Sequence, residues 1–143
     1  MGALQWRRDE DVPAGDLEAV RQGVIVHGVQ QMQGSDARAI ACALYEDGQL
    51  IAGAWGRTEC QRLYLEHLWV LAARRGQGLG GACLRQIEAQ ALARGCVDAL
   101  IETVQDDAAA MFEQMGYACI AHLHDYLPGF TRHTLLKVWR ARD

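Results

Sequence analysis

Apolar positions recur with a helical period in some segments of the chain and with a strand period of two residues in others. These periods predict its helices and strands. From Asp11 to Met32, apolar residues recur at helical spacing, which indicates a helix. Small apolar residues over 38–45 lead through Asp47-Gly48 into a second apolar run over 50–55, which indicates a hairpin with a tight turn. Residues 62–71 alternate with period two and predict a third strand.

The second half of the chain predicts two further helices and three further strands. An apolar stripe that begins at Leu79 ends near Gly95, as in an amphipathic helix with a glycine cap. The later patterns predict a strand over 97–104, a short helix over 106–115 and strands over 117–124 and 134–140. Hairpins pair antiparallel and a strand-helix-strand unit pairs parallel, so this order predicts an α/β fold with a mixed sheet and helices on both faces.

Composition limits the class of protein. The 143 residues, of which 50% are hydrophobic, suit a single domain spanning residues 1–143. A net charge of -4 without a basic stripe argues against nucleic acid as a partner, and no stretch is apolar over a bilayer's length. Five cysteines without a CxxC pair are interpreted as reduced core thiols. We therefore expect a cytoplasmic protein with no membrane partner.

A glycine-rich segment follows the third strand and carries the clearest chemical signal. It reads Arg75-Gly76-Gln77-Gly78-Leu79-Gly80-Gly81 and opens a predicted helix. Its glycines let several backbone N–H groups point into one concavity, and the helix adds the positive end of its dipole. Arg74 and Arg75 add positive charge, so the segment predicts a phosphate or pyrophosphate site.

Two well-known nucleotide-binding loops are also rich in glycine, and the surrounding sequence argues against both. A P-loop needs Lys followed by Ser or Thr, whereas this chain has Gly80-Gly81-Ala82. A dinucleotide fingerprint matches Gly76, Gly78 and Gly81, with Glu102 at a suitable distance for a ribose contact. However, that fingerprint opens a doubly wound parallel sheet, and here it follows a meander with little chain left. A glycine-rich connector without a ligand remains a further alternative.

The motif Arg75-x-x-Gly78-x-Gly80 resembles the signature of the GNAT N-acetyltransferases. The resemblance runs from about Leu50 to Val138 and includes residues 63–70, 112–117 and Asp125-Tyr126-x-Pro128-Gly129. It implies a mixed, mostly antiparallel sheet of about six to seven strands with a splayed central pair. It also implies acetyl-CoA as co-substrate, with its pantetheine arm between the splayed strands.

The resemblance implies that an acetyl group passes to a primary amine of a small molecule or peptide by direct attack in a ternary complex. The alternative function is a catalytically weak sensor that binds acyl-CoA. The protein could also form a homodimer. The residues implied to contact the cofactor are Leu68, Val70, Arg75, Gly76, Gln77, Gly78, Leu79, Gly80, Gly81 and Phe112.

Glu66 is the candidate catalytic base, because the attacking amine must lose a proton. Strand alternation puts Glu66 on the face of Leu68 and Val70, where apolar neighbours should raise its carboxyl pKa. The alternative is a solvated or salt-bridged strand residue. His67 should point the other way unless a bulge turns it.

Several further residues have weaker or negative signals. Phe112 stands where many members of the family have a tyrosine acid, so the thiolate would leave unaided or take a proton from water, Tyr117 or Tyr126. The terminal-strand histidines show no recurring ligand spacing, so no metal is expected. These are His122, His124 and His133. The tryptophans are interpreted as core or dimer-interface residues. They are Trp6, Trp55, Trp69 and Trp139.

Overall fold

The computed structural model describes residues 2–31 and 36–142. These residues form two compact units, which are described separately, and the single domain expected from the sequence stays a prediction. In the first unit, a 3-10 turn at Asp9–Asp11 precedes α1, Ala14–Gln31. The Pro13 carbonyl accepts hydrogen bonds from the amides of Asp16 and Leu17, which starts the helix near its predicted position. Its predicted end at Met32 lies outside the described residues.

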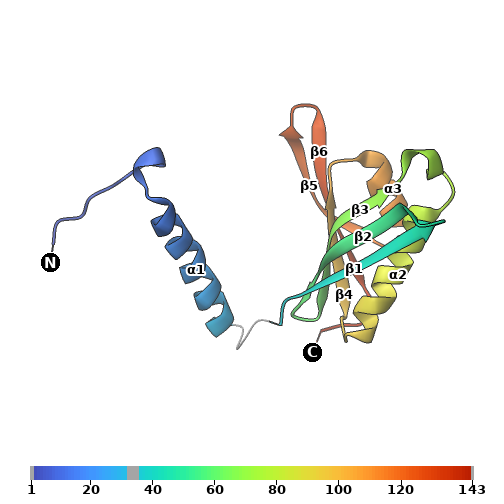
Figure 1. Cartoon of the computed structure of the whole chain (residues 1–143), viewed down its shortest axis with the longest axis horizontal. Coiled ribbons are helices and arrows are strands. Elements are labelled where there is room, and N and C mark those ends of the chain that lie inside the picture. The colour runs from blue at the N-terminus through green and yellow to red at the C-terminus, as the bar shows by residue number, and fades with distance from the viewer. Residues whose placement is uncertain (1, 32–35, 143) are drawn as a thin grey trace. The chain divides into compact units, whose positions relative to one another are not determined.

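The second unit contains a six-stranded sheet and two α-helices (Figure 1). Their bounds are β1 Arg38–Glu46, β2 Gln49–Glu59, β3 Arg62–Val70, α2 Leu79–Ala93, β4 Asp98–Thr103, α3 Asp106–Gln114, β5 Ala118–Leu127 and β6 Phe130–Val138. The strand order is β1-β2-β3-β4-β6-β5, and only β3 and β4 pair parallel. The predicted mixed, mostly antiparallel sheet is confirmed.

The last hairpin is longer than the sequence pattern predicted. β5 continues to Leu127 and β6 already begins at Phe130, where the two residues pair. Pro128 and Gly129 between them form a two-residue turn, a pair of residues well suited to that role. The segment expected to link 124 and 134 therefore consists of strand and turn.

The central strands β3 and β4 separate part-way along their length. Their parallel pairing runs only from Arg62 opposite Asp98 to Leu65 opposite Ile101. β3 continues to Val70 and β4 to Thr103 without further pairing to each other. The predicted splayed central pair is confirmed, and its open end begins at Leu65.

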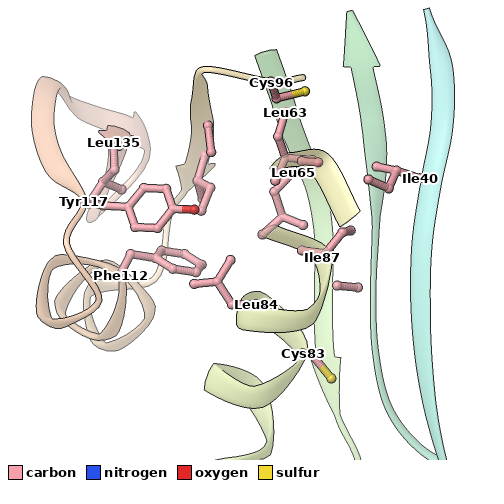
Figure 2. Close-up of a cluster of buried hydrophobic side chains, with 14 of the residues drawn as sticks. Ile40, Leu63, Leu65, Cys83, Leu84, Ile87, Cys96, Phe112, Tyr117 and Leu135 are labelled. Carbon is pink, nitrogen blue, oxygen red and sulfur yellow. The ribbon is translucent and has the colours of Figure 1, made fainter. Parts of the chain in front are cut away.

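One buried cluster holds both helices of this unit against the sheet (Figure 2). Leu84 and Ile87 come from the apolar stripe of α2, as predicted, and Phe112 of α3 belongs to the same cluster. Burial of such side chains stabilises the fold by about 1.5–3 kcal/mol each. Both helices therefore share one core, while helices on the other face of the sheet stay a prediction.

The tryptophans, expected in the core or at a dimer interface, and the cysteines, expected in the core, differ in their exposure. Trp55 and Trp69 are 54% and 43% exposed, and only Trp139 packs against the core cluster. Cys60 is exposed, whereas burial raises the pKa of the Cys83 and Cys96 thiols. Among the described residues, no helix is long and apolar enough to cross a membrane.

Candidate active site

A bulge in β3 places Glu66 at the point where the central strands separate. Trp55 pairs with His67 and Gly56 pairs with Leu65, which leaves Glu66 as an extra residue between them. A Cβ on Gly56 would collide with the Tyr64 carbonyl oxygen, so glycine permits the close strand approach at the bulge. Residues around a bulge are re-aimed relative to a regular strand.

The bulge corrects one expectation about this strand. Leu68 pairs with buried Ala54, and both Leu68 and Val70 pack against the core beside α2. Glu66 lies on the opposite face, where it contacts Arg57, because the extra residue reverses the alternation. His67 shares this face and stacks on Trp55 at a ring separation of 5.3 Å. The prediction that Glu66 shares a face with Leu68 and Val70 was therefore wrong.

Glu66 is held by an ion pair. Arg57 Nη1 donates to Glu66 Oε1 at 2.7 Å, and the Glu66 side chain is 39% exposed. The Arg57 guanidinium also lies over the Tyr64 ring, 4.1 Å from its centroid. Glu66 therefore has a charged partner, in agreement with the alternative of a salt-bridged strand residue.

A cavity of about 540 Å³ opens where β3 and β4 diverge, a volume suited to a small molecule. Glu66 and Tyr126 line this cavity together with Glu102 and Arg132, which form an ion pair. The Arg132 guanidinium lies 5.0 Å from the centroid of the Tyr126 ring. The full lining is Leu65, Glu66, His67, Leu68, Trp69, Ile101, Glu102, Thr103, Val104, Gln105, Ala108, Phe112, Tyr126 and Arg132. The splay thus brings acidic and aromatic side chains around one ligand-sized space.

The glycine-rich loop lies at the start of α2. Gly76 and Gly78 have φ values of 75° and 79°, and a Cβ on either would meet no atom within 4 Å. Gly78 is the N-cap of α2 and provides no side-chain hydrogen bond to the first helical amides. Arg75 Nε donates to the Val70 carbonyl at 3.1 Å, which ties the loop to the end of β3. These features fit a phosphate group on the backbone amides.

The two arginines beside the loop already have protein partners. Arg75 donates to the end of β3, and Arg74 forms an ion pair with Glu46. Neither contact occupies the loop's backbone amides. None of the residues 75–81 lines the cavity at the splay. The loop and the cavity are therefore two neighbouring parts of the candidate site, joined by β3.

Phe112 and the nearby tyrosines differ in what they can reach. Phe112 is buried and contributes to the cavity wall. Tyr117 is buried, and its hydroxyl donates to Glu88 Oε2 at 2.9 Å, while Lys137 Nζ lies 3.1 Å from the same oxygen. Burial, with Glu88 beside it, raises the pKa of Tyr117 far above its usual value. Tyr126, unlike Tyr117, lines the cavity.

The sequence pattern did not assign the contacts that the structure gives to four residues. Arg57, Glu102 and Arg132 form its ion pairs, whereas the sequence suggested only a ribose contact for Glu102. Cys119 lies beside His122 and His133, although their spacing in the sequence indicates no shared site. The sequence analysis allowed for a bulge near His67, and the glycine at position 56, inside a strand, is the feature that could have indicated it.

Comparison with known proteins decides the class. The sequence pattern of the Acetyltransferase (GNAT) family matches residues 4–117, well over half of the chain. The chain belongs to the GNAT family of acetyltransferases. This family uses acetyl-CoA, which agrees with a glycine-rich loop at the start of a helix beside a splayed strand pair. The acetyltransferase is therefore an enzyme of the N-acetyltransferase class.

Named relatives of this acetyltransferase cover nearly the whole chain. Blasticidin-S acetyltransferase from Streptomyces morookaense is 38% identical over 141 residues, which is 94% of each chain. Acetyltransferase Atu2258 from Agrobacterium fabrum is 31% identical over 79% of this chain and 84% of its own length. A crystal structure of an acetyltransferase-class protein from Agrobacterium tumefaciens matches with a TM-score of 0.84 and 27% identity, over 94% of this chain and 99% of that one.

Proposed function

We propose that this enzyme transfers an acetyl group from acetyl-CoA to a primary amine of a small molecule, and that Glu66 accepts the amine proton. The observation that carries the proposal is the position of Glu66. It sits on the bulge at the end of β3–β4 pairing and lines the cavity that opens there. A carboxylate at this place can take a proton from an amine bound in the cavity, directly or through one water.

The glycine loop and the free edge of β3 support the cofactor assignment. The backbone amides of residues 76–81 would hold the pyrophosphate at the N-terminus of α2, with the Arg75 side chain beside them. Beyond Leu65, the β3 edge that faces β4 has no strand partner, so the backbone of Leu68 and Val70 would bind the pantetheine amides. Phe112 would contact the same arm from the cavity wall. When bound, acetyl-CoA supplies the acetyl group as an activated thioester.

The acceptor we propose is a small molecule carrying a primary amine. The cavity is lined by Glu66, by the Glu102–Arg132 ion pair and by the aromatic rings of Trp69 and Tyr126, which suit a small ligand with an amine and a planar group. Its volume of about 540 Å³ fits a small molecule better than a folded protein. The name of the Streptomyces morookaense relative, Blasticidin-S acetyltransferase, supports a small-molecule acceptor for this chain as well.

A thiol-release assay tests this function. Acetyl-CoA is supplied with blasticidin S, polyamines, aminoglycosides, amino acids and peptides, and the appearance of free CoA is followed. We expect turnover with at least one small-molecule amine and slower turnover with peptides. Tight acetyl-CoA binding without turnover on any acceptor would favour the sensor alternative, which the named acetyltransferase relatives do not support.

We further propose that the enzyme is cytoplasmic and assembles as a homodimer. The sequence has five cysteines and no CxxC pair, which suits reduced thiols in a reducing compartment. Trp55 and Trp69 expose large apolar rings, which are enriched at interfaces between subunits. Sedimentation analysis tests the dimer, and a monomer at all concentrations would exclude it.

A further inference from the structure

The β5–β6 hairpin carries a compact group of metal-binding side chains away from the proposed acetyl-transfer residues. Cys119, His122 and His133 each offer one ligand atom, and these atoms all lie within 4.8 Å of one another. Cys119 and His133 are partly buried, and His122 is exposed. A thiolate and two imidazoles are donors that zinc-class ions prefer.

A second bulge brings these side chains together. Cys119 pairs with Leu135 and Ala121 with Thr134, so Ile120 is an extra residue in β5. In a regular strand, Cys119 and His122 would point to opposite faces, because they lie three positions apart. The bulge reverses the alternation, so both face the same side as His133, which pairs directly with His122.

Two donor separations in this group are close to those of tetrahedral coordination, and Cys119 Sγ also lies 3.3 Å from His122 Nε2. The two Nδ1 atoms of His122 and His133 are 3.1 Å apart, and Cys119 Sγ lies 3.8 Å from His122 Nδ1. Bond lengths of about 2.0–2.1 Å to nitrogen and about 2.3 Å to sulfur imply separations of about 3.3 Å and about 3.6 Å around one zinc ion.

The acidic partner of His133 gives an independent reason to expect a metal. His133 Nε2 lies 2.8 Å from Asp106 Oδ1, at the start of α3. This contact places the imidazole proton on Nε2 and leaves the Nδ1 lone pair directed toward His122. A carboxylate that orients a histidine in this way is the usual outer partner of a metal ligand.

We propose that Cys119, His122 and His133 form a Zn²⁺ site in which Asp106 orients His133. Three protein donors leave a fourth position for water or an exogenous ligand. The ion would connect β5, β6 and, through Asp106, the first turn of α3. Arg132 and Gln105, which adjoin these residues in sequence, line the acceptor cavity, so the ion would also brace that wall.

Titration of the metal-free full-length protein with Co²⁺ tests the site spectroscopically. We expect saturation at one equivalent, a sulfur-to-cobalt charge-transfer band and the d–d bands of a four-coordinate ion, all displaced by Zn²⁺. Cys119→Ser should abolish the charge-transfer band. Cys60→Ser is the matched control, because Cys60 is the exposed cysteine on the β2–β3 turn, and it should leave the band intact.

Asp106→Asn separates ligation from the orientation of His133. It should weaken Zn²⁺ affinity by about 10- to 100-fold while preserving the sulfur-to-cobalt band. Zn²⁺ should also raise the melting temperature of the wild type but not of His122→Ala, an exposed substitution that leaves the core untouched. Absence of saturable binding, a band that survives Cys119→Ser, or an equal thermal shift in His122→Ala would overturn the proposal.

Discussion

Arg57 Nη1 donates to Glu66 Oε1 at 2.7 Å across two neighbouring strands. The pair forms because the β3 bulge turns Glu66 away from the core and toward the face that carries Arg57. The guanidinium fixes the direction of a carboxylate that would otherwise rotate freely, and the cavity lies beside it. The same carboxylate is thus both the salt-bridged residue and the base we propose.

Replacing Glu66 by glutamine tests that role. Glu66→Gln keeps the size of the side chain but removes the proton acceptor, so kcat at neutral pH should fall by about 100-fold or more. The Kd for acetyl-CoA, measured by calorimetry, should change little, because the pyrophosphate cradle lies elsewhere. Unchanged turnover on a proven acceptor would leave Glu66 with a structural role only.

The glycine loop should be essential for cofactor binding. Gly78→Glu puts a negative side chain at the N-cap of α2, where the proposed pyrophosphate would lie, and should abolish the calorimetric signal of acetyl-CoA. Gly95→Glu is a matched control, because Gly95 also has a positive φ of 87° and open space around it. It imposes similar backbone strain beyond the other end of α2 and should leave binding intact.

Two results would contradict this assignment. Equal loss of binding in Gly78→Glu and Gly95→Glu would mean that backbone strain, and not charge in the cradle, causes the effect. Binding of NADH in place of acetyl-CoA would support the dinucleotide fingerprint instead.

Local sequence patterns predicted the elements because each pattern depends on near neighbours in the chain. The Asp47-Gly48 turn and the α2 stripe are local in this sense, and both are confirmed. Glu66 and Ile120 are extra residues only relative to a partner strand, so a single strand's alternation could not place them. The two bulges determine which side chains lie on the same face of the sheet. The sequence pattern therefore could not predict which residues contact one another at the two sites.

The stability of the fold should depend on Asp98 in acid. Asp98 is buried and accepts hydrogen bonds from Arg62 at 2.7 Å and Arg142 at 3.2 Å. Burial alone would raise the pKa of Asp98, but the two guanidinium groups outweigh it and hold that pKa below its usual value. The stabilisation is therefore present above the unfolded pKa of about 3.9 and is lost as the pH falls through the folded pKa.

Urea unfolding at several pH values measures this contribution. Asp98→Asn should lower the free energy of unfolding by about 2 kcal/mol at a pH of about 7. The effect should be no larger, because both arginines are partly exposed and solvent screens their charges. The difference from the wild type should shrink below pH about 4. Asp47→Asn, in the exposed β1–β2 turn, is the control and should change little. A difference that stays constant with pH would exclude the ion pairs as its cause.

We propose that Tyr126 is the tyrosine that protonates the departing CoA thiolate, because it lines the cavity. Phe112 provides no hydroxyl, and the Tyr117 hydroxyl is buried and donates to Glu88, so neither supplies an acid to the cavity. Tyr126→Phe should therefore lower kcat by about tenfold or more. Tyr117→Phe should lower the melting temperature, because it leaves Glu88 with one fewer partner, while sparing kcat.

Phe112→Tyr completes this test, because it adds a hydroxyl where many members of the family have their acid. If the cavity wall accepts that hydroxyl, kcat should rise by up to about 100-fold, and Tyr126→Phe should then cost less in the Phe112→Tyr background. A thiolate is a tolerable leaving group near neutral pH, so the wild type can work without a second acid. If Tyr117→Phe abolishes turnover while Tyr126→Phe has no effect, the acid lies in the buried Glu88 network and not in the cavity.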